Sequence, residues 1–376
     1  MEQTIEDGQS SNSIAATDTA RIRTITNQQS TIDYAAIRNQ AFNKSNTANH
    51  ITSISMVRKA TTNKVIGGCG VSFKVAMDDG RSEYFFKSQS AANISHFDAE
   101  SHLQEVAACQ LSTSVLHWDV VPTCRGFRLY ERDLQHVHEP ENDTRRRAKF
   151  RVKDIFRLGS CNLQKDSDGA PFLSGSLMDW SKKPLQQVTS QTIVAAAATS
   201  DGTNATSGST LNLTYSAVEY ATFHYLGACM KSDHNHFATM NDGGPRRKKF
   251  PTKFVAIDND RCFTLRGISS NTNVPQVHRE RISLWEDMVL RQIPCHNFPD
   301  SVVERILNLA KAKKSSDGAR ASDLLMHSIR HDVLSKELLS FFLRQQKQSE
   351  AALLLELDER IEVLANRFTN ECHFGL

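Results

Sequence analysis

The sequence has little that would place it in a membrane or on nucleic acid. Its longest purely apolar run, residues 193–198, is far shorter than the ~20 residues of a spanning helix, so we expect no transmembrane segment. The charges nearly cancel, with 45 lysines and arginines against 42 acidic residues and a balance of +3. Basic runs at 145–147 and 246–249 are typical of solvated loops, although the second could attract an acidic substrate. We expect no nucleic-acid partner.

A signal peptide and closely paired cysteines are also missing. Residues 1–7 are acidic and polar, so we expect either an intracellular protein or a chain whose true amino terminus lies upstream. The eight cysteines form no Cys-x-x-Cys motif, which excludes a zinc ribbon, and their even number permits disulfides without implying them. His224, Cys229, His234 and His236 are enough ligands for zinc, but their spacing matches no standard motif, and zinc stays an alternative.

A polar tail and a β-rich half make up the first part of the chain. Residues 1–52 are rich in Ser, Thr, Asn and Gln, which predicts a disordered tail. Apolar alternation predicts strands at 71–75 and 83–87, and helical spacing predicts a helix at 97–112 with one buried face. We expect a further strand near 150–158 and a loop-rich stretch at 159–210.

The sequence predicts that the second part of the chain is mostly helical and contains one β-hairpin. A long helix with one buried face should run from Leu211 to Cys229. Strands at 237–240 and 253–257 flank a turn, and at least three helices should follow between residues 301 and 368. This order predicts an α+β protein with two lobes: a β-rich amino lobe at 53–180 and a helical carboxy lobe at 181–376.

Four charged residues stand in an order that suits phosphoryl transfer. This reaction needs a cation on the phosphates and carboxylates that hold a divalent metal. Lys87 ends a predicted strand, and Glu105 lies on the next helix, 105 − 87 = 18 positions later, which is typical of a phosphate-binding lysine and its partner. The alternative is that both are solvated charges.

Asp233 and Asp258 lie at the two ends of the predicted hairpin 233–258. They should be close in space although 258 − 233 = 25 positions apart, one serving an incoming hydroxyl and the other holding Mg²⁺ or Mn²⁺ beside Asn259. The alternative is a pair of ordinary polar turns. A turn with Gly68 and Gly70 could approach phosphates, but it matches neither GxGxxG nor a P-loop, and an ordinary loop is its alternative.

In this order the segments resemble the four-jointed family of atypical secretory-pathway kinases, which are related to the Golgi casein kinase. Asp233-His234-Asn235-His236-Phe237 is similar to the Asp-Arg-His-His-Tyr catalytic loop of the Golgi casein kinase. Asp258-Asn259-Asp260-Arg261-Cys262-Phe263 is similar to its metal-binding Asp-Asn-Gly-Arg-Gly-Phe, and Gly175-Ser176-Leu177 to the family's inter-lobe segment. The resemblance covers roughly residues 60–345, and it departs from the pattern at His234, Asp260 and Cys262.

The resemblance implies a two-lobed atypical protein-kinase-like fold and a metal-dependent transfer of the ATP γ-phosphate to a protein Ser/Thr or glycan hydroxyl. The alternative is a weak or inactive kinase-like binding module. The implied roles are phosphate binding by Lys87 with Gly68 and Gly70, lysine orientation or metal binding by Glu105, metal binding by Asp258, acid–base catalysis by Asp233, and support by Asn235, His236 and Asn259.

The resemblance also bears on compartment and cysteine pairing. It implies a protein of the Golgi lumen or a secreted protein, with a cytoplasmic one as the alternative. The five Asn-x-Ser/Thr sequons, at Asn43, Asn93, Asn142, Asn204 and Asn212, add only slightly to that expectation. The family has a cysteine at the position of Cys295, which makes Cys229–Cys295 a candidate disulfide.

Overall fold

The computed structural model describes thirteen segments of the chain. These are residues 51–56, 72–77, 83–89, 101–134, 163–179, 185–199, 208–229, 236–241, 250–259, 262–263, 276–314, 318–346 and 350–374. All of them belong to the unit Thr47–Leu376. The predicted strand at 150–158, the glycine-rich turn and both basic runs lie outside the described residues. None of the helices in the described segments is long and apolar enough to cross a membrane.

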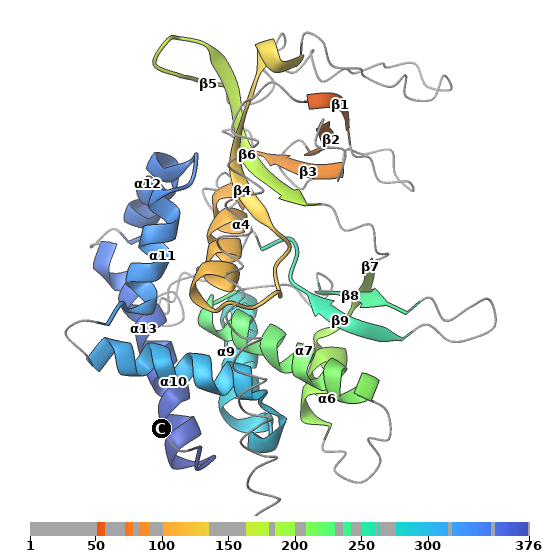
Figure 1. The fold of residues 1–376 in the computed structure, drawn as a ribbon, viewed down its shortest axis with the longest axis vertical. Helices are drawn as coiled ribbons and strands as arrows, with labels where there is room; N and C mark the ends of the chain where they lie inside the picture. Colours follow the sequence, from red (N-terminus) through yellow and green to blue (C-terminus); the bar gives the residue numbers. More distant parts are fainter. Residues whose placement is uncertain are drawn as a thin grey trace, which may run out of the picture. The chain divides into compact units, whose positions relative to one another are not determined.

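Strands dominate the first half of the described chain and helices the second, so the predicted α+β class is confirmed (Figure 1). The strands are β1 (Ile51–Met56), β2 (Ser72–Met77), β3 (Glu83–Ser88), β4 (Cys124–Tyr130), β5 (Gln164–Lys165), β6 (Pro171–Asp179), β7 (Leu185–Val188), β8 (His236–Met240) and β9 (Pro251–Val255). The α-helices are α4 (Ser101–Gln110), α6 (Ser190–Ala198), α7 (Gly208–Leu226), α9 (Gln276–Asp287), α10 (Asp300–Lys314), α11 (Ala321–Arg330), α12 (Ser335–Gln346) and α13 (Glu350–Asn370).

A six-stranded antiparallel sheet organises the amino half. Its order is β1-β2-β3-β6-β4, with β5 paired to β6. β2 and β3 are the two strands that the apolar alternation predicts, and β1 begins at Ile51, inside the predicted tail. One face of the sheet buries its own apolar cluster, with Phe73, Val75 and Phe86 at 0% exposure.

The prediction of a loop-rich stretch at 159–210 is wrong. This stretch contains β6, β7 and α6, and β6 pairs with both β3 and β4 in the sheet. Strand β6 is buried on both faces, so its sequence has no alternation, and it includes serines and a glycine that are typical of loops. A Cβ at Gly175 would lie 2.4 Å from the Phe86 ring and 2.6 Å from the Lys87 carbonyl. Gly175-Ser176-Leu177 therefore belongs to the interior of the sheet.

Helix α4 forms where the sequence predicts a helix, but its surroundings differ from the prediction. Nine of its ten residues are buried, whereas the apolar spacing predicts a single buried face. The helix packs against β4 and β6 on one side and against α11 and α12 on another, near the middle of Figure 1. Two of its buried polar residues contact the sheet and the segment that follows β9: the His102 ring lies 3.4 Å from the Ser174 hydroxyl on β6, and Gln104 donates to the Cys262 carbonyl.

A second antiparallel sheet, β7-β8-β9, contains the predicted hairpin. Phe237 on β8 pairs with Val255 on β9. Helix α7 packs against β9 and is the predicted long helix, but Leu211 is 46% exposed and Cys229 lies beyond its last turn. Every residue from Tyr220 to Leu226 is buried, so the single buried face is wrong for this helix too.

Helices α10 to α13 follow, in agreement with the prediction of at least three. Helix α10 begins at Asp300, and α13 packs against α10, α11 and α12 through a continuous apolar core. That core extends through α7 to the buried side of α4. The sheet and the helical half are therefore joined through α4.

Candidate active site

Lys87 lies between two carboxylates that come from different halves of the sequence. Its Nζ atom is 3.3 Å from Oε1 of Glu105 and 2.8 Å from Oδ1 of Asp258. The lysine side chain is 13% exposed, that of Glu105 is 1% exposed and that of Asp258 is 41% exposed. One carboxylate is therefore sealed inside the protein, and the other faces solvent.

The sheet fixes the lysine from both sides. Lys87 pairs with Ser72 on β2 and with Ser176 on β6, so its backbone sits in the interior of the sheet. Helix α4 packs against β6 and presents Glu105 to the ammonium. The 18-residue spacing thus reflects a strand and a helix that pack side by side.

Asp258 comes directly after the hairpin strand β9, in an unusual backbone conformation. Its φ angle is 60°, in the left-handed region that few residues other than glycine adopt, although Asp and Asn tolerate it best. The preceding chain is held in place because the Ala256 amide donates to the Val120 carbonyl at 2.9 Å. Asn259, at 1% exposure, donates its Nδ2 to the Ala256 carbonyl. These bonds define the direction in which Asp258 leaves the sheet.

His102 lies one turn before Glu105 on α4 and is fully buried. Burial in the first place, and the Lys87 charge in the second, lower the pKa of His102 to about 3. The imidazole is therefore neutral at physiological pH, and its Nε2 lies 3.4 Å from the Ser174 hydroxyl. A neutral ring adds no positive charge beside Lys87.

His236, which the resemblance implies as a supporting residue, anchors the start of β8. Its Nδ1 lies 2.8 Å from the Tyr220 hydroxyl on α7, and its ring meets Trp285 edge-on at 5.4 Å. Burial raises the pKa of Tyr220 well above its usual value, so the phenol is neutral and available as a hydrogen-bond donor. Asp233 and Asn235 precede this anchor in the sequence and lie outside the described residues, as do Gly68 and Gly70.

The cysteines pair differently from the candidate given by the resemblance. The structure contains Cys229–Cys262 and Cys295–Cys372, so Cys229–Cys295 is wrong. Cys229 follows α7 and Cys262 follows β9, and the packing of α7 against β9 brings the two together. This contact is tertiary and has no trace in the spacing of the cysteines.

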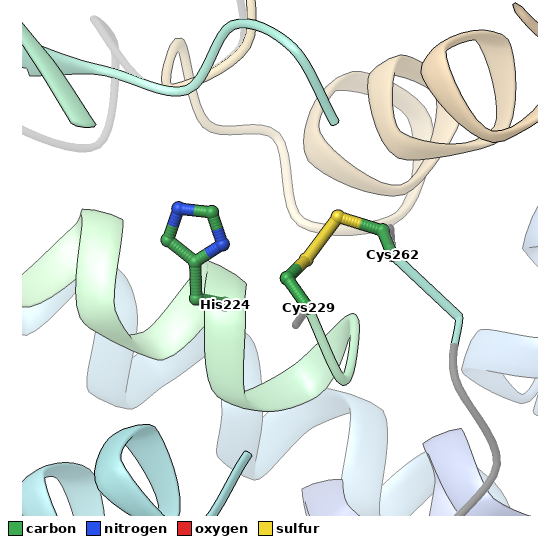
Figure 2. A group of neighbouring side chains, drawn as sticks. All are labelled: His224, Cys229 and Cys262. Atoms are coloured by element: carbon green, nitrogen blue, oxygen red, sulfur yellow. A yellow bond between two sulfur atoms is a disulfide. The ribbon is translucent and has the colours of Figure 1, made fainter. Parts of the chain in front are cut away.

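The zinc alternative does not form as the sequence suggests. Figure 2 shows His224 beside Cys229 and Cys262, and their ligand atoms lie within 4.8 Å of one another. The two sulfurs are joined, however, and zinc binds cysteine as a thiolate. His236 contacts the Tyr220 hydroxyl instead, and His234 lies outside the described residues.

Oxygen atoms suited to a hard divalent cation are present at Asp258, which contacts the lysine, and at the residue that follows it. The carboxylate of Asp258 is accessible, and Oδ1 of the adjacent Asn259 is buried with no hydrogen-bond partner among the described residues. Mg²⁺ and Mn²⁺ prefer carboxylate and amide oxygens, so the residues fit such an ion. Sequence reasoning missed Gln104, whose Nε2 donates to the Cys262 carbonyl at 3.0 Å. Its position next to Glu105 on a helix was the available signal.

No protein family matches the sequence, and no curated protein is similar to it. Among solved structures, the chain is similar to the crystal structure of the Golgi casein kinase, with a TM-score of 0.48 and 15% identity over 86% of this chain and 74% of that one. The Golgi casein kinase with Mn/ADP bound gives a TM-score of 0.46 and 15% identity over 85% and 74%. The Helicobacter pylori proinflammatory kinase CtkA gives 0.34 and 11% identity over 86% and 100%. Similarity at this level assigns neither a family nor an activity to the chain.

Proposed function

We propose that the protein is a metal-dependent kinase that transfers the γ-phosphate of ATP to a hydroxyl group of a protein Ser/Thr or a glycan. The observation that supports this most is the placement of Lys87 between buried Glu105 and solvent-facing Asp258. An ammonium held by a sealed carboxylate, next to an accessible one, suits a phosphate chain that carries a divalent metal.

Each side chain has a distinct task in this proposal. Lys87 donates hydrogen bonds to phosphate oxygens, and Glu105 keeps the ammonium in place from the buried side. Asp258, with Glu105 close by, would hold Mg²⁺ or Mn²⁺, which neutralises charge that develops on the phosphates. Asp233 would accept the proton of the attacking hydroxyl, and the His236–Tyr220 bond anchors the strand that follows it.

The disulfides and the sequence resemblance together support a location in the secretory pathway or outside the cell. Disulfides persist in oxidising compartments and are rare in the cytosol. Cys229–Cys262 and Cys295–Cys372 therefore support a secretory-pathway or secreted protein. Glycosidase sensitivity of the protein isolated from cells tests this placement.

A kinase-like binding module without turnover is the second candidate. His234, Asp260 and Cys262 stand where the family has an arginine and two glycines, and Cys262 is used in a disulfide. A change of a metal-loop glycine into a cross-linked cysteine favours a site whose chemistry differs from that of the family.

Phosphate transfer by the purified protein separates the two candidates. With Mn²⁺ and ATP, the wild type should label an acceptor or itself, and Asp233→Asn should lose about two to four powers of ten in kcat while still binding nucleotide. A binder without turnover would still be stabilised by nucleotide, by about 2.7 kcal/mol at a hundredfold excess over Kd. Nucleotide that neither binds nor reacts would contradict the kinase and leave the kinase-like module as the better account.

A further inference from the structure

A covalent link joins the segment that carries Asp258 to the end of α7. Cys262 follows Asp258 by 262 − 258 = 4 positions and forms the disulfide with Cys229. Figure 2 shows the two side chains bridging the turn after α7 and the chain beyond β9. Both cysteines are only 1% exposed, so the link lies inside the core and not on the surface.

Helix α4 holds the same residue by a hydrogen bond. Gln104 is 4% exposed and donates its Nε2 to the Cys262 carbonyl at 3.0 Å. It is adjacent in the chain to Glu105, which contacts Lys87. Cys262 is therefore tied to the turn after α7 by a covalent bond and to α4 by a buried hydrogen bond.

The backbone around this junction is held in conformations that need support. Ala228, Asp258 and Phe263 have φ angles of 46°, 60° and 62°, all in the left-handed region. Residues other than glycine keep such conformations only where the surrounding structure enforces them, and these conformations gather at functional sites. The Phe263 amide donates to the Gly227 carbonyl, which adds a main-chain bond between the same two segments.

We propose that Cys229, Cys262 and Gln104 are positioning residues of the candidate active site. The disulfide and the Gln104–Cys262 hydrogen bond, together called the Cys262 clamp, hold the segment after β9 so that Asp258 stays beside Lys87 and Glu105. The expected effect of the clamp on nucleotide binding rests on the proposed function. The expected effect of the clamp on the segment that follows β9 does not depend on that function. Removing a residue that orients a metal ligand typically costs ~10- to 100-fold in metal affinity.

The second disulfide supplies a matched control for the first. The measured quantity is the gain, the factor by which Mn²⁺ raises the affinity for ATP. In the double variant C229S/C262S this factor should be about tenfold smaller than in the wild type, whereas in C295S/C372S it should stay within about twofold of the wild-type value. Calorimetric Kd values with and without Mn²⁺, below the melting temperature of each variant, give the gain. A general loss of stability would lower Tm in both variants but would not make their Mn²⁺-dependent increases in ATP affinity differ. The same Mn²⁺-dependent increase in both variants would overturn the proposal.

A substitution on α4 tests the clamp without removing a disulfide. Gln104→Met keeps the length and helix propensity of the side chain but removes the donor to the Cys262 carbonyl, and it should reduce the Mn²⁺-dependent gain by about three- to tenfold. Gln110→Met, on the same helix, removes contacts to Ser114 and Ser328 and is the control. A Gln104→Met protein that binds like the control would count against the clamp.

Hydrogen exchange gives an outcome that does not depend on nucleotide. In C229S/C262S the backbone amides at positions 262 and 263 should exchange at least about tenfold faster than in C295S/C372S, because the clamp protects them from opening to solvent. Unchanged exchange at these amides would overturn the clamp whatever the protein binds. Faster exchange in a protein that never binds Mn²⁺ and ATP would instead keep the clamp as a structural device and contradict the proposed function.

Discussion

The two carboxylates that contact Lys87 come from regions built in opposite ways. Glu105 lies on α4, which is buried on nearly every side between the first sheet and the helices. Asp258 leaves the second sheet in a left-handed conformation and remains 41% exposed. The first region secures the lysine, and the second leaves an acid where a ligand reaches it. The two carboxylates should therefore respond differently to substitution.

The largest effect on stability should come from Glu105→Gln. This change removes the buried partner of Lys87, and breaking a buried ion pair costs several kcal/mol. We expect a loss near the lower end, about 3 kcal/mol, because Lys87 keeps Asp258. Denaturant unfolding measures the change, with Glu304→Gln on the exposed side of α10 as the control. A loss no larger than that of the control would mean that the α4 side does not secure the lysine.

Asp258→Asn should affect binding instead of stability. Asn tolerates the left-handed backbone, so the fold should change by no more than about 0.5 kcal/mol. The affinity for Mn²⁺ and ATP together should fall about a hundredfold, which corresponds to about 2.7 kcal/mol. Calorimetry checks the binding, with the exposed Asp119→Asn as the control. Wild-type affinity in Asp258→Asn would remove the metal-binding role from this residue.

The α4 region should also show a pH dependence of its own. The pKa of His102 is about 3 in the folded protein, below the ordinary value of 6.5, so the unfolded chain binds a proton that the folded one does not. Its contribution to stability is present above pH 6.5 and is lost as the pH falls from there toward 3. Between pH 7 and 4.5 this loss is about 2.5 kcal/mol, and His102→Gln should remove it from unfolding curves measured at the two pH values. The same loss in the variant would show that another group carries it.

The smallest effect is expected for an exposed ion pair on the hairpin side. Lys253 lies 2.6 Å from Asp119, but the two side chains are 39% and 77% exposed. Water screens such pairs, so Asp119→Asn should change the free energy of unfolding by no more than about 0.5 kcal/mol. A loss of unfolding free energy above about 1 kcal/mol would show that solvent exposure does not explain the difference in strength between this ion pair and the buried Lys87–Glu105 pair.

Local sequence patterns predicted β2 and α4, which lie at the candidate site, better than they predicted β6. Alternation gives β2, and apolar spacing gives the centre of α4, because apolar residues recur in each at the period of its secondary structure. Strand β6 was missed since it is buried on both faces and uses serine and glycine, which lack the signal of an amphipathic strand. The buried polar residues of α4 were missed for a related reason: periodicity detects apolar faces only.

The sequence alone predicted a strand-rich half followed by a helical half, and it named the charged residues that meet at the candidate site. Lys87, Glu105 and Asp258 could be named because strand, helix and hairpin are local structures with local signals. Only the tertiary structure decided that Glu105 is sealed, that Asp258 is exposed and that Cys262 pairs with Cys229. Burial and pairing depend on which distant surfaces pack together, and that choice is set by the shape of the whole core.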